Sequence, residues 1–174
     1  MRPRHALALI AGLLGGAACA PPPLPEPLFN VSAAPAHDHA PLATLERSEC
    51  YTVCPVYKLT VYRDGTIEYT GTRNVKVTGK ALGQITEAQV DKLEDLFLRY
   101  QYLQFKPNYR HSHITDMPSV SMSYTPAGGT AKTVTHDLGD EDAPVALHRI
   151  EHSIDKLVRI ERWVGTDAER EQSH

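Results

Sequence analysis

Residues 55–69 read PVYKLTVYRDGTIEY, in which apolar and polar side chains alternate on both sides of an Asp-Gly pair. Alternation with a period of two is typical of β-strands that bury one face. A three-residue loop, Arg63-Asp64-Gly65, places Val61 opposite Ile67 and keeps the apolar side chains of both strands on one face. We therefore expect a hairpin closed by a type I turn with Gly65 in the left-handed region, which makes a bulge.

Two further segments predict β-structure. A short extra strand is expected at residues 74–78, where two valines share a face. A second hairpin is expected because the apolar residues of 120–124 alternate with serines, and a turn at 126–129 leads into a return strand at 131–137. The polar alternates indicate that one face of the sheet is solvated.

Two amphipathic segments predict helices. The first begins at Thr86, the expected N-cap, with Gln89 completing a capping box, and it ends before Pro107. The second begins near Asp142, the expected cap, and ends at Gly165. The order strands, helix, strands, helix predicts an α+β fold. In it, two hairpins and the short extra strand form an antiparallel sheet, and both helices pack on one face.

The first 18 residues have the parts of a secretory signal: a basic start, an apolar run and small residues before Cys19. The string Gly16-Ala17-Ala18-Cys19 resembles the bacterial lipobox, with Gly16 where a lipobox usually carries an aliphatic residue. The resemblance implies cleavage before Cys19 and lipidation of that cysteine. The alternative is an ordinary secretory signal cut after the small residues, with Cys19 incidental.

Ala20 is not the Asp that resembles an inner-membrane retention signal. We therefore expect an exported protein that is lipid-anchored to the cell envelope, at the outer membrane and facing the periplasm. The chain has 174 residues and a formal net charge of −3, which gives no reason to expect nucleic-acid binding.

Four parts are expected along the chain. A signal peptide at 1–18 is followed by a lipidated N-terminus and proline-rich linker at 19–43, since more than half of the 13 prolines fall there. A single α+β domain follows at 44–165, and a disordered polar tail at 166–174.

Cys50 and Cys54 are left as an even pair once Cys19 is lipidated. Disulfides form and persist in oxidising compartments, so we expect a structural disulfide that locks the entry into the first strand. Redox-active or free thiols and metal ligands are the alternatives. The spacing is not Cys-x-x-Cys, and no second cysteine pair completes a tetrahedral metal site.

The string His148-Arg149-Ile150-Glu151-His152 matches His-x-x-Glu-His, a zinc-peptidase arrangement in which two histidines hold the metal beside a carboxylate base. The competing interpretation is solvated histidines on a helix face, because a chain with nine histidines produces such a string easily. We therefore expect no catalytic residue, no metal and no cofactor. A metal-dependent hydrolase using His148, Glu151 and His152 is the alternative function.

Three other polar groups are weaker candidates. A candidate ligand or partner loop precedes the second hairpin and contains Tyr109, His111, His113 and Asp116. His37-Asp38-His39 lies in the linker, where a metal would bind weakly. An acidic group lacks the order of a calcium loop and is explained by a helix cap and a charged turn; it comprises Asp137, Asp140, Glu141 and Asp142.

Four strings occur in order along the chain: CYTVCPVY at 50–57, YRDGT at 62–66, VTGK at 77–80 and TDMP at 115–118. They resemble the successive signatures of a bacterial domain-of-unknown-function family, the one numbered 6438. Thr52 stands where members often carry Gly. The resemblance covers about residues 45–160, implies a similar order of elements and carries no established activity.

The function expected from these features is that of a non-enzymatic binding or scaffolding module. It would be tethered to the membrane through the lipid on Cys19. It would present the solvated sheet face or the 109–118 loop to an unknown envelope protein or a small ligand.

Overall fold

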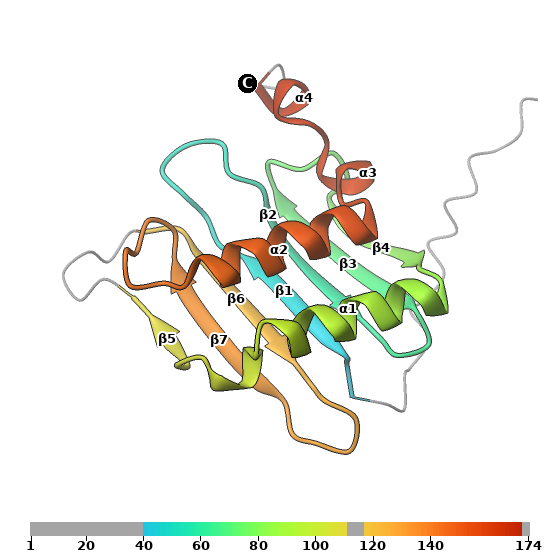
Figure 1. Cartoon of the computed structure of the whole chain (residues 1–174). Helices are drawn as coiled ribbons and strands as arrows, with labels where there is room; N and C mark the ends of the chain where they lie inside the picture. The colour runs from blue at the N-terminus through green and yellow to red at the C-terminus, as the bar shows by residue number, and fades with distance from the viewer. Residues whose placement is uncertain (1–39, 111–116, 172–174) are drawn as a thin grey trace, which may run out of the picture.

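Helices cover one face of a single seven-stranded sheet in this computed structural model, which describes residues 40–110 and 117–171 (Figure 1). The strands are β1 (Ala43–Arg47), β2 (Val56–Val61), β3 (Thr66–Arg73), β4 (Gly79–Gln84), β5 (Asn108–Tyr109), β6 (Ser119–Tyr124) and β7 (Lys132–Asp137). The helices are α1 (Glu87–Arg99), α2 (Val145–Val158), α3 (Glu161–Val164) and α4 (Asp167–Glu171), and a 3₁₀ turn, η1, spans Tyr102–Gln104. The expected α+β class is confirmed.

The first hairpin has the predicted register. Val61 lies opposite Ile67 in the β2–β3 pair. The turn closes with a hydrogen bond from the amide of Tyr62 to the carbonyl of Thr66 at 2.9 Å, and Gly65 has a φ of +83°. A β-carbon at Gly65 would also lie 2.3 Å from the carbonyl oxygen of Ile85. Both the positive φ and the lack of space therefore require glycine in this turn.

The sheet differs from the expected one in three places. Its order is β4-β3-β2-β1-β6-β7-β5, so β1, where no strand was predicted, is the central strand that joins the two hairpins. β5 runs parallel to β7, so the sheet is mixed and not antiparallel throughout. Residues 74–78 are not a strand, because the amides of Lys76 and Val77 donate to the carbonyls of Val164 and Trp163. The extra strand is β4.

Helix α1 begins as predicted. The amide of Thr86 donates to Oε1 of Gln89 at 3.0 Å, and the buried side chains Val90, Leu93 and Phe97 face the sheet. The 3₁₀ turn after α1 extends this packing through Tyr102, which is buried and whose hydroxyl donates to the carbonyl of Met122 at 2.5 Å.

The second helix is shorter than expected. The N-cap of α2 is Pro144 and not Asp142, whose amide instead donates to the Asp140 carboxylate in the preceding turn. The helix ends at Arg159, which has a φ of 55° and allows the amide of Ile160 to donate to the carbonyl of Asp155. The apolar pattern continues into α3, which ends at Gly165, so two helices replace the single predicted one.

Part of the segment interpreted as a polar tail forms α4, where Glu169 pairs with Lys76 at 3.3 Å. Within the described residues, no helix is both long and apolar enough to cross a membrane.

Candidate functional site

Four side chains form one row across the helix-facing side of the sheet. The strand registers place Tyr57 opposite Arg47, Arg47 opposite Val120 and Val120 opposite His136. Three of these positions are polar, although the same face is otherwise apolar. α2 crosses above this row (Figure 1), and the side chains of Glu151 and Asp155, one helical turn apart, meet it from the helix side.

Arg47 is the centre of the resulting hydrogen-bond network. Its guanidinium donates to Asp155 at 2.8 Å, to Glu151 at 3.3 Å and, through Nε, to the Tyr57 hydroxyl at 2.9 Å. The Tyr57 hydroxyl donates in turn to Oδ1 of Asp155 at 2.8 Å. Each polar group in this part of the core therefore has partners, as burial requires.

Burial and the neighbouring charges shift the pKa values of this network. Burial by itself lowers the pKa of Arg47, but Tyr57, Asp155 and Glu151 together raise it above its ordinary value. Burial raises the pKa of Tyr57, and the charge of Asp155 raises it further. Arg47 is thus a permanent cation, and Tyr57 is a neutral hydrogen-bond donor across the physiological range.

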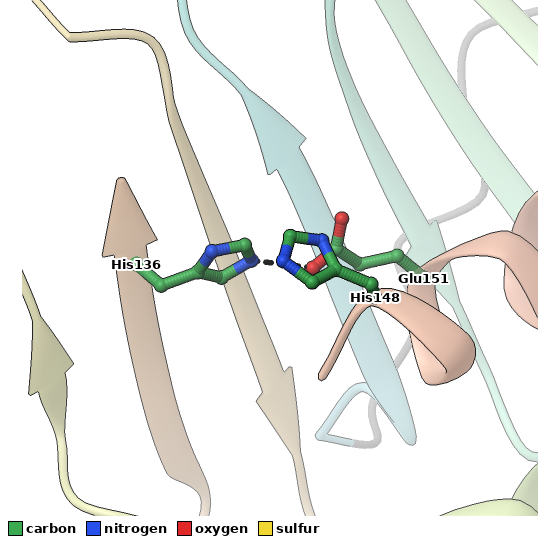
Figure 2. Close-up of side chains that lie close together, drawn as sticks. All are labelled: His136, His148 and Glu151. Carbon is green, nitrogen blue, oxygen red and sulfur yellow. Dashed lines mark hydrogen bonds and ion pairs between the residues drawn. The ribbon is translucent and has the colours of Figure 1, made fainter. Parts of the chain in front are cut away.

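A second cluster adjoins the network between β7 and the first turns of α2 (Figure 2). Nε2 of His136 lies 2.5 Å from Oε1 of Glu151, and both residues are nearly inaccessible, at 1% and 3% exposure. The ring of His148 lies edge-on to the ring of His136, with the centroids 4.9 Å apart. A ligand atom from each of the three residues lies within 4.8 Å of the others.

The structure therefore separates the predicted His148, Glu151 and His152 string. His148 and Glu151 come together, but their third neighbour is His136 from β7, while His152 is exposed and lines a cavity instead. The expectation that the histidines of this string lie on a solvated helix face agrees with the exposure of both His148 and His152, although the ring of His148 also contacts that of His136. The spacing of the histidines in residues 148–152 could not indicate His136, which lies on another strand. Its place two residues after Val134 did indicate that His136 faces the core.

A cavity of about 840 Å³ lies on the other side of the Arg47 network. Its walls come from the ends of β1 and β2, from α2 and α3, and from α4. The basic groups that line it are Arg47, Lys156, Arg159 and Arg170, and the acidic groups are Asp155, Glu161 and Asp167. Lys156 and Arg159 are exposed and form no ion pair within residues 40–110 and 117–171. They are the cations available to a ligand in this cavity.

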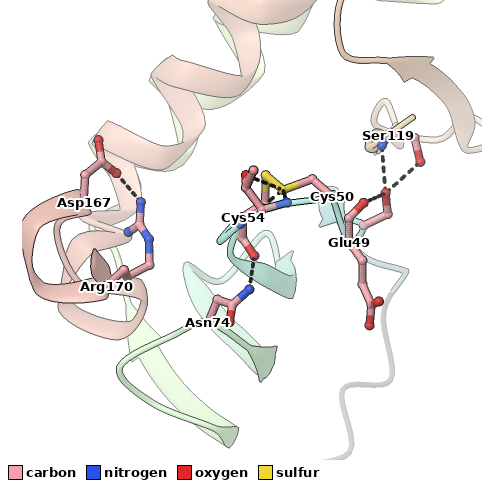
Figure 3. The surroundings of a disulfide bond; sticks show 9 residues. Glu49, Cys50, Cys54, Asn74, Ser119, Asp167 and Arg170 are labelled. Atoms are coloured by element: carbon pink, nitrogen blue, oxygen red, sulfur yellow. Dashed lines mark hydrogen bonds and ion pairs between the residues drawn. A yellow bond between two sulfur atoms is a disulfide. The ribbon is translucent and has the colours of Figure 1, made fainter. Parts of the chain in front are cut away.

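Cys54 lines the cavity and forms a disulfide with Cys50 (Figure 3). The structure contains this bond, as expected from the cysteine pair. Asn74 donates through Nδ2 to the carbonyl of Cys54 at 3.0 Å, which ties the cysteine loop to the end of β3. Ser48 and Ser119 also line the cavity, and Oγ of Ser48 accepts a hydrogen bond from the amide of Ser119 at 2.7 Å.

The remaining predicted residues occupy ordinary positions or lie outside the described part of the chain. Tyr109 is buried in β5, and its hydroxyl accepts a hydrogen bond from the amide of Lys106. Asp137 is buried and pairs with Arg110 at 3.3 Å. The candidates that lie outside the described residues are Cys19, His37, Asp38, His39, His111, His113 and Asp116.

Comparison with protein families found one that covers the domain. A family model described as Domain of unknown function (DUF6438) matches residues 41–158, which include the Arg47 network and the His136 cluster. A comparison with curated proteins found no match for the chain.

Proposed function

The chain belongs to the domain-of-unknown-function family DUF6438, and from this premise we propose that it is a membrane-tethered, non-enzymatic binding module of the cell envelope. Its ligand would be an anionic group that occupies the 840 Å³ cavity beside Lys156 and Arg159. The observation that carries the proposal is this cavity. It contains two cations that form no ion pair with any described residue, beside polar groups that hydrogen-bond to one another.

The N-terminal sequence supports the proposed location in the cell envelope. A signal-like segment ends at Cys19, and the proline-rich residues 20–43 would hold a domain at a distance from the membrane. The Cys50–Cys54 disulfide agrees with an oxidising compartment outside the cytoplasm. Lipidation of Cys19 would supply the anchor, since several acyl chains together give stable membrane binding.

The chemistry of the cavity supports an anionic ligand. A volume of about 840 Å³ is within the range of sites that bind small molecules. Lys156 and Arg159 are exposed within it, and Arg170 is engaged with Asp167 and the carbonyl of Gly165. A carboxylate or phosphate, from a small ligand or from a side chain of another envelope protein, would gain charge-assisted hydrogen bonds from both available cations.

The carboxylates beside the cavity favour binding over catalysis. Asp155 and Glu151 both accept hydrogen bonds from Arg47, and Asp155 also accepts one from Tyr57. Carboxylate oxygens that already accept hydrogen bonds from protein donors are less available to accept a proton from a substrate. The alternative is a metal-dependent hydrolase using His148 and Glu151, and the contact of these residues with His136 is the observation that favours it.

Charge removal in the cavity tests the proposal. Lys156→Gln combined with Arg159→Asn removes both available cations, and Asn tolerates the left-handed conformation of position 159. We expect native mass spectrometry of the protein purified from envelopes to detect a bound small anion. If the anion belongs to a protein, we expect photo-cross-linking from a reactive residue in place of Glu161 to give a discrete product.

The double variant should lose the bound species in either experiment. The matched control, Lys92→Gln with Arg99→Gln, removes two exposed cations from α1 and should retain it. Retention by the cavity variant, the absence of any bound species from the wild type, or hydrolysis of peptides or esters by the purified chain would each overturn the proposal.

A further inference from the structure

His136, His148 and Glu151 bring two imidazoles and a carboxylate together from separate elements, β7 and α2 (Figure 2). We propose that these three side chains bind a divalent transition-metal ion, with Zn²⁺ as the first candidate. Two histidines and one glutamate are an established protein ligand set for zinc when water completes the coordination. The site is independent of the anion cavity and of the binding function proposed for it.

The hydrogen bonding of His136 leaves its Nε2 available as a ligand. Nδ1 of His136 lies 3.3 Å from the carbonyl oxygen of Asp137, an atom that can only accept a hydrogen bond. An Nδ1–H group suits this contact, and Nε2 would offer a lone pair to a metal once its own proton is displaced. A carbonyl that orients the ring of a histidine in this way is the usual outer partner of a metal-bound histidine.

Nε2 of His136 and Oε1 of Glu151 form a hydrogen bond of 2.5 Å, so a proton lies between them when no metal is bound. A metal ion would take the place of this proton. Zinc bonds of about 2.0–2.1 Å place tetrahedral ligand atoms about 3.3 Å apart, so metal entry would widen this contact by about 0.8 Å.

The charge of the buried network also favours an added cation. Glu151 and Asp155 each contribute a negative charge, and Arg47 is the single positive charge that contacts both. The second carboxylate oxygen of Glu151 is held by Arg47 at 3.3 Å, which leaves Oε1 directed toward His136. A divalent ion at Oε1 would offset the excess negative charge in a buried position, where it is costly.

His148 would complete the protein ligands from the solvent side. It is exposed on α2, so its ring can adjust to the metal, and its exposure gives the ion an entry path and a position for water. The bound metal would join α2 to β7 in addition to the apolar packing between them. Metal binding would therefore raise the thermal stability of the folded chain.

Zinc titration of the purified full-length chain tests this site. We expect one tightly bound Zn²⁺ per chain by calorimetry, a rise in the melting temperature with zinc, and visible absorption bands of tetrahedral cobalt with Co²⁺ in its place. His148→Ala should weaken zinc binding at least about tenfold and abolish the cobalt bands, because it removes a ligand. Position 148 is exposed, so this variant should fold.

The matched control is His152→Ala, which removes another exposed histidine one turn further along the same helix. It should bind zinc as tightly as the wild type and show the same cobalt spectrum. The proposal is overturned if the wild type binds no zinc, which would leave a proton between His136 and Glu151. Equal losses in the two histidine variants would also overturn it, since binding would then reside on the helix surface.

Discussion

At the scale of single residues, Arg47 has the largest electrostatic role in the core. It lies at the end of the central strand, and its side chain is 20% exposed while that of its partner Glu151 is 4% exposed. A buried ion pair adds little stability relative to apolar residues, because desolvation offsets the attraction. Removal of one partner is different, since the remaining charges stay buried without compensation.

Arg47→Ala should therefore lower the free energy of unfolding by about 3–5 kcal/mol. Lys58→Ala is the matched control, because Lys58 pairs with Glu46 at 3.9 Å and both side chains are more than half exposed. Loss of the pair between Lys58 and Glu46 should lower the free energy of unfolding by less than about 1 kcal/mol. Urea unfolding with a metal chelator present measures both values, and equal losses would show that the Arg47 network is not structurally important.

At the scale of elements, β4 and α3 depend on a close contact that only glycine allows. A β-carbon at Gly83 would lie 2.7 Å from the Trp163 ring, which stacks on Tyr69 with centroids 5.1 Å apart. The guanidinium carbon of Arg162 lies over the indole, 4.0 Å from its centroid. The indole is therefore already in contact with Tyr69 and Arg162 where it meets Gly83.

Gly83→Ala should displace α3 from the sheet and cost about 1–3 kcal/mol, as overpacking does. Trp163 is the single tryptophan of the chain, so a red shift of its fluorescence would report the displacement directly. In a chain that carries Trp163→Leu, Gly83→Ala should lower the free energy of unfolding much less, because the smaller leucine side chain leaves room for the added methyl group. An unchanged cost in that background would show that the indole is not the obstacle.

The elements differ in how far local sequence predicts them. The first hairpin and α1 were predicted with their turn and cap, because Gly65 and the Thr86–Gln89 pair act over a few residues. The end of α2 was predicted wrongly. Arg159 adopts a left-handed conformation without glycine, and the apolar pattern continues through this break because both helices pack on the same core.

At the scale of the whole molecule, buried tyrosines link stability to pH. Burial raises the pKa of Tyr69 to about 12, and it also raises the pKa values of Tyr57 and Tyr102. The hydroxyl of Tyr69 has no hydrogen-bond partner among the described residues, so nothing compensates its ionised form. Folding therefore favours the neutral phenol.

The free energy of unfolding should fall as the pH rises from about 10 to about 12. In this window the unfolded chain releases the Tyr69 proton, whereas the folded chain retains it, so unfolding becomes more favourable; below the window both states keep the proton. Urea unfolding across this range measures the effect. Tyr69→Phe should make the fall shallower, and Tyr51→Phe, which removes a fully exposed hydroxyl, should leave it unchanged. Identical curves for the two variants would contradict this account.

The candidate site could be predicted only in part. The sequence indicated His148 and Glu151 as neighbours on a helix, since three residues of separation place them on one face. It did not indicate Arg47, Tyr57 or His136. Each of these polar residues occupies a position that faces the core in the alternating pattern of its strand. The pattern of one strand does not show which residues of the neighbouring strands lie beside it.

The sequence by itself determined the α+β class, the first hairpin, the start of α1, the second hairpin and the cysteine pair, because each depends on contacts between residues close in the chain. Only the tertiary structure decided the central place of β1, the parallel β5 and the meeting of His136 with α2. These features depend on strand order and register, which follow from the packing of the whole core. The proposed functional residues belong to this second group, since they lie where four separate segments of the chain converge.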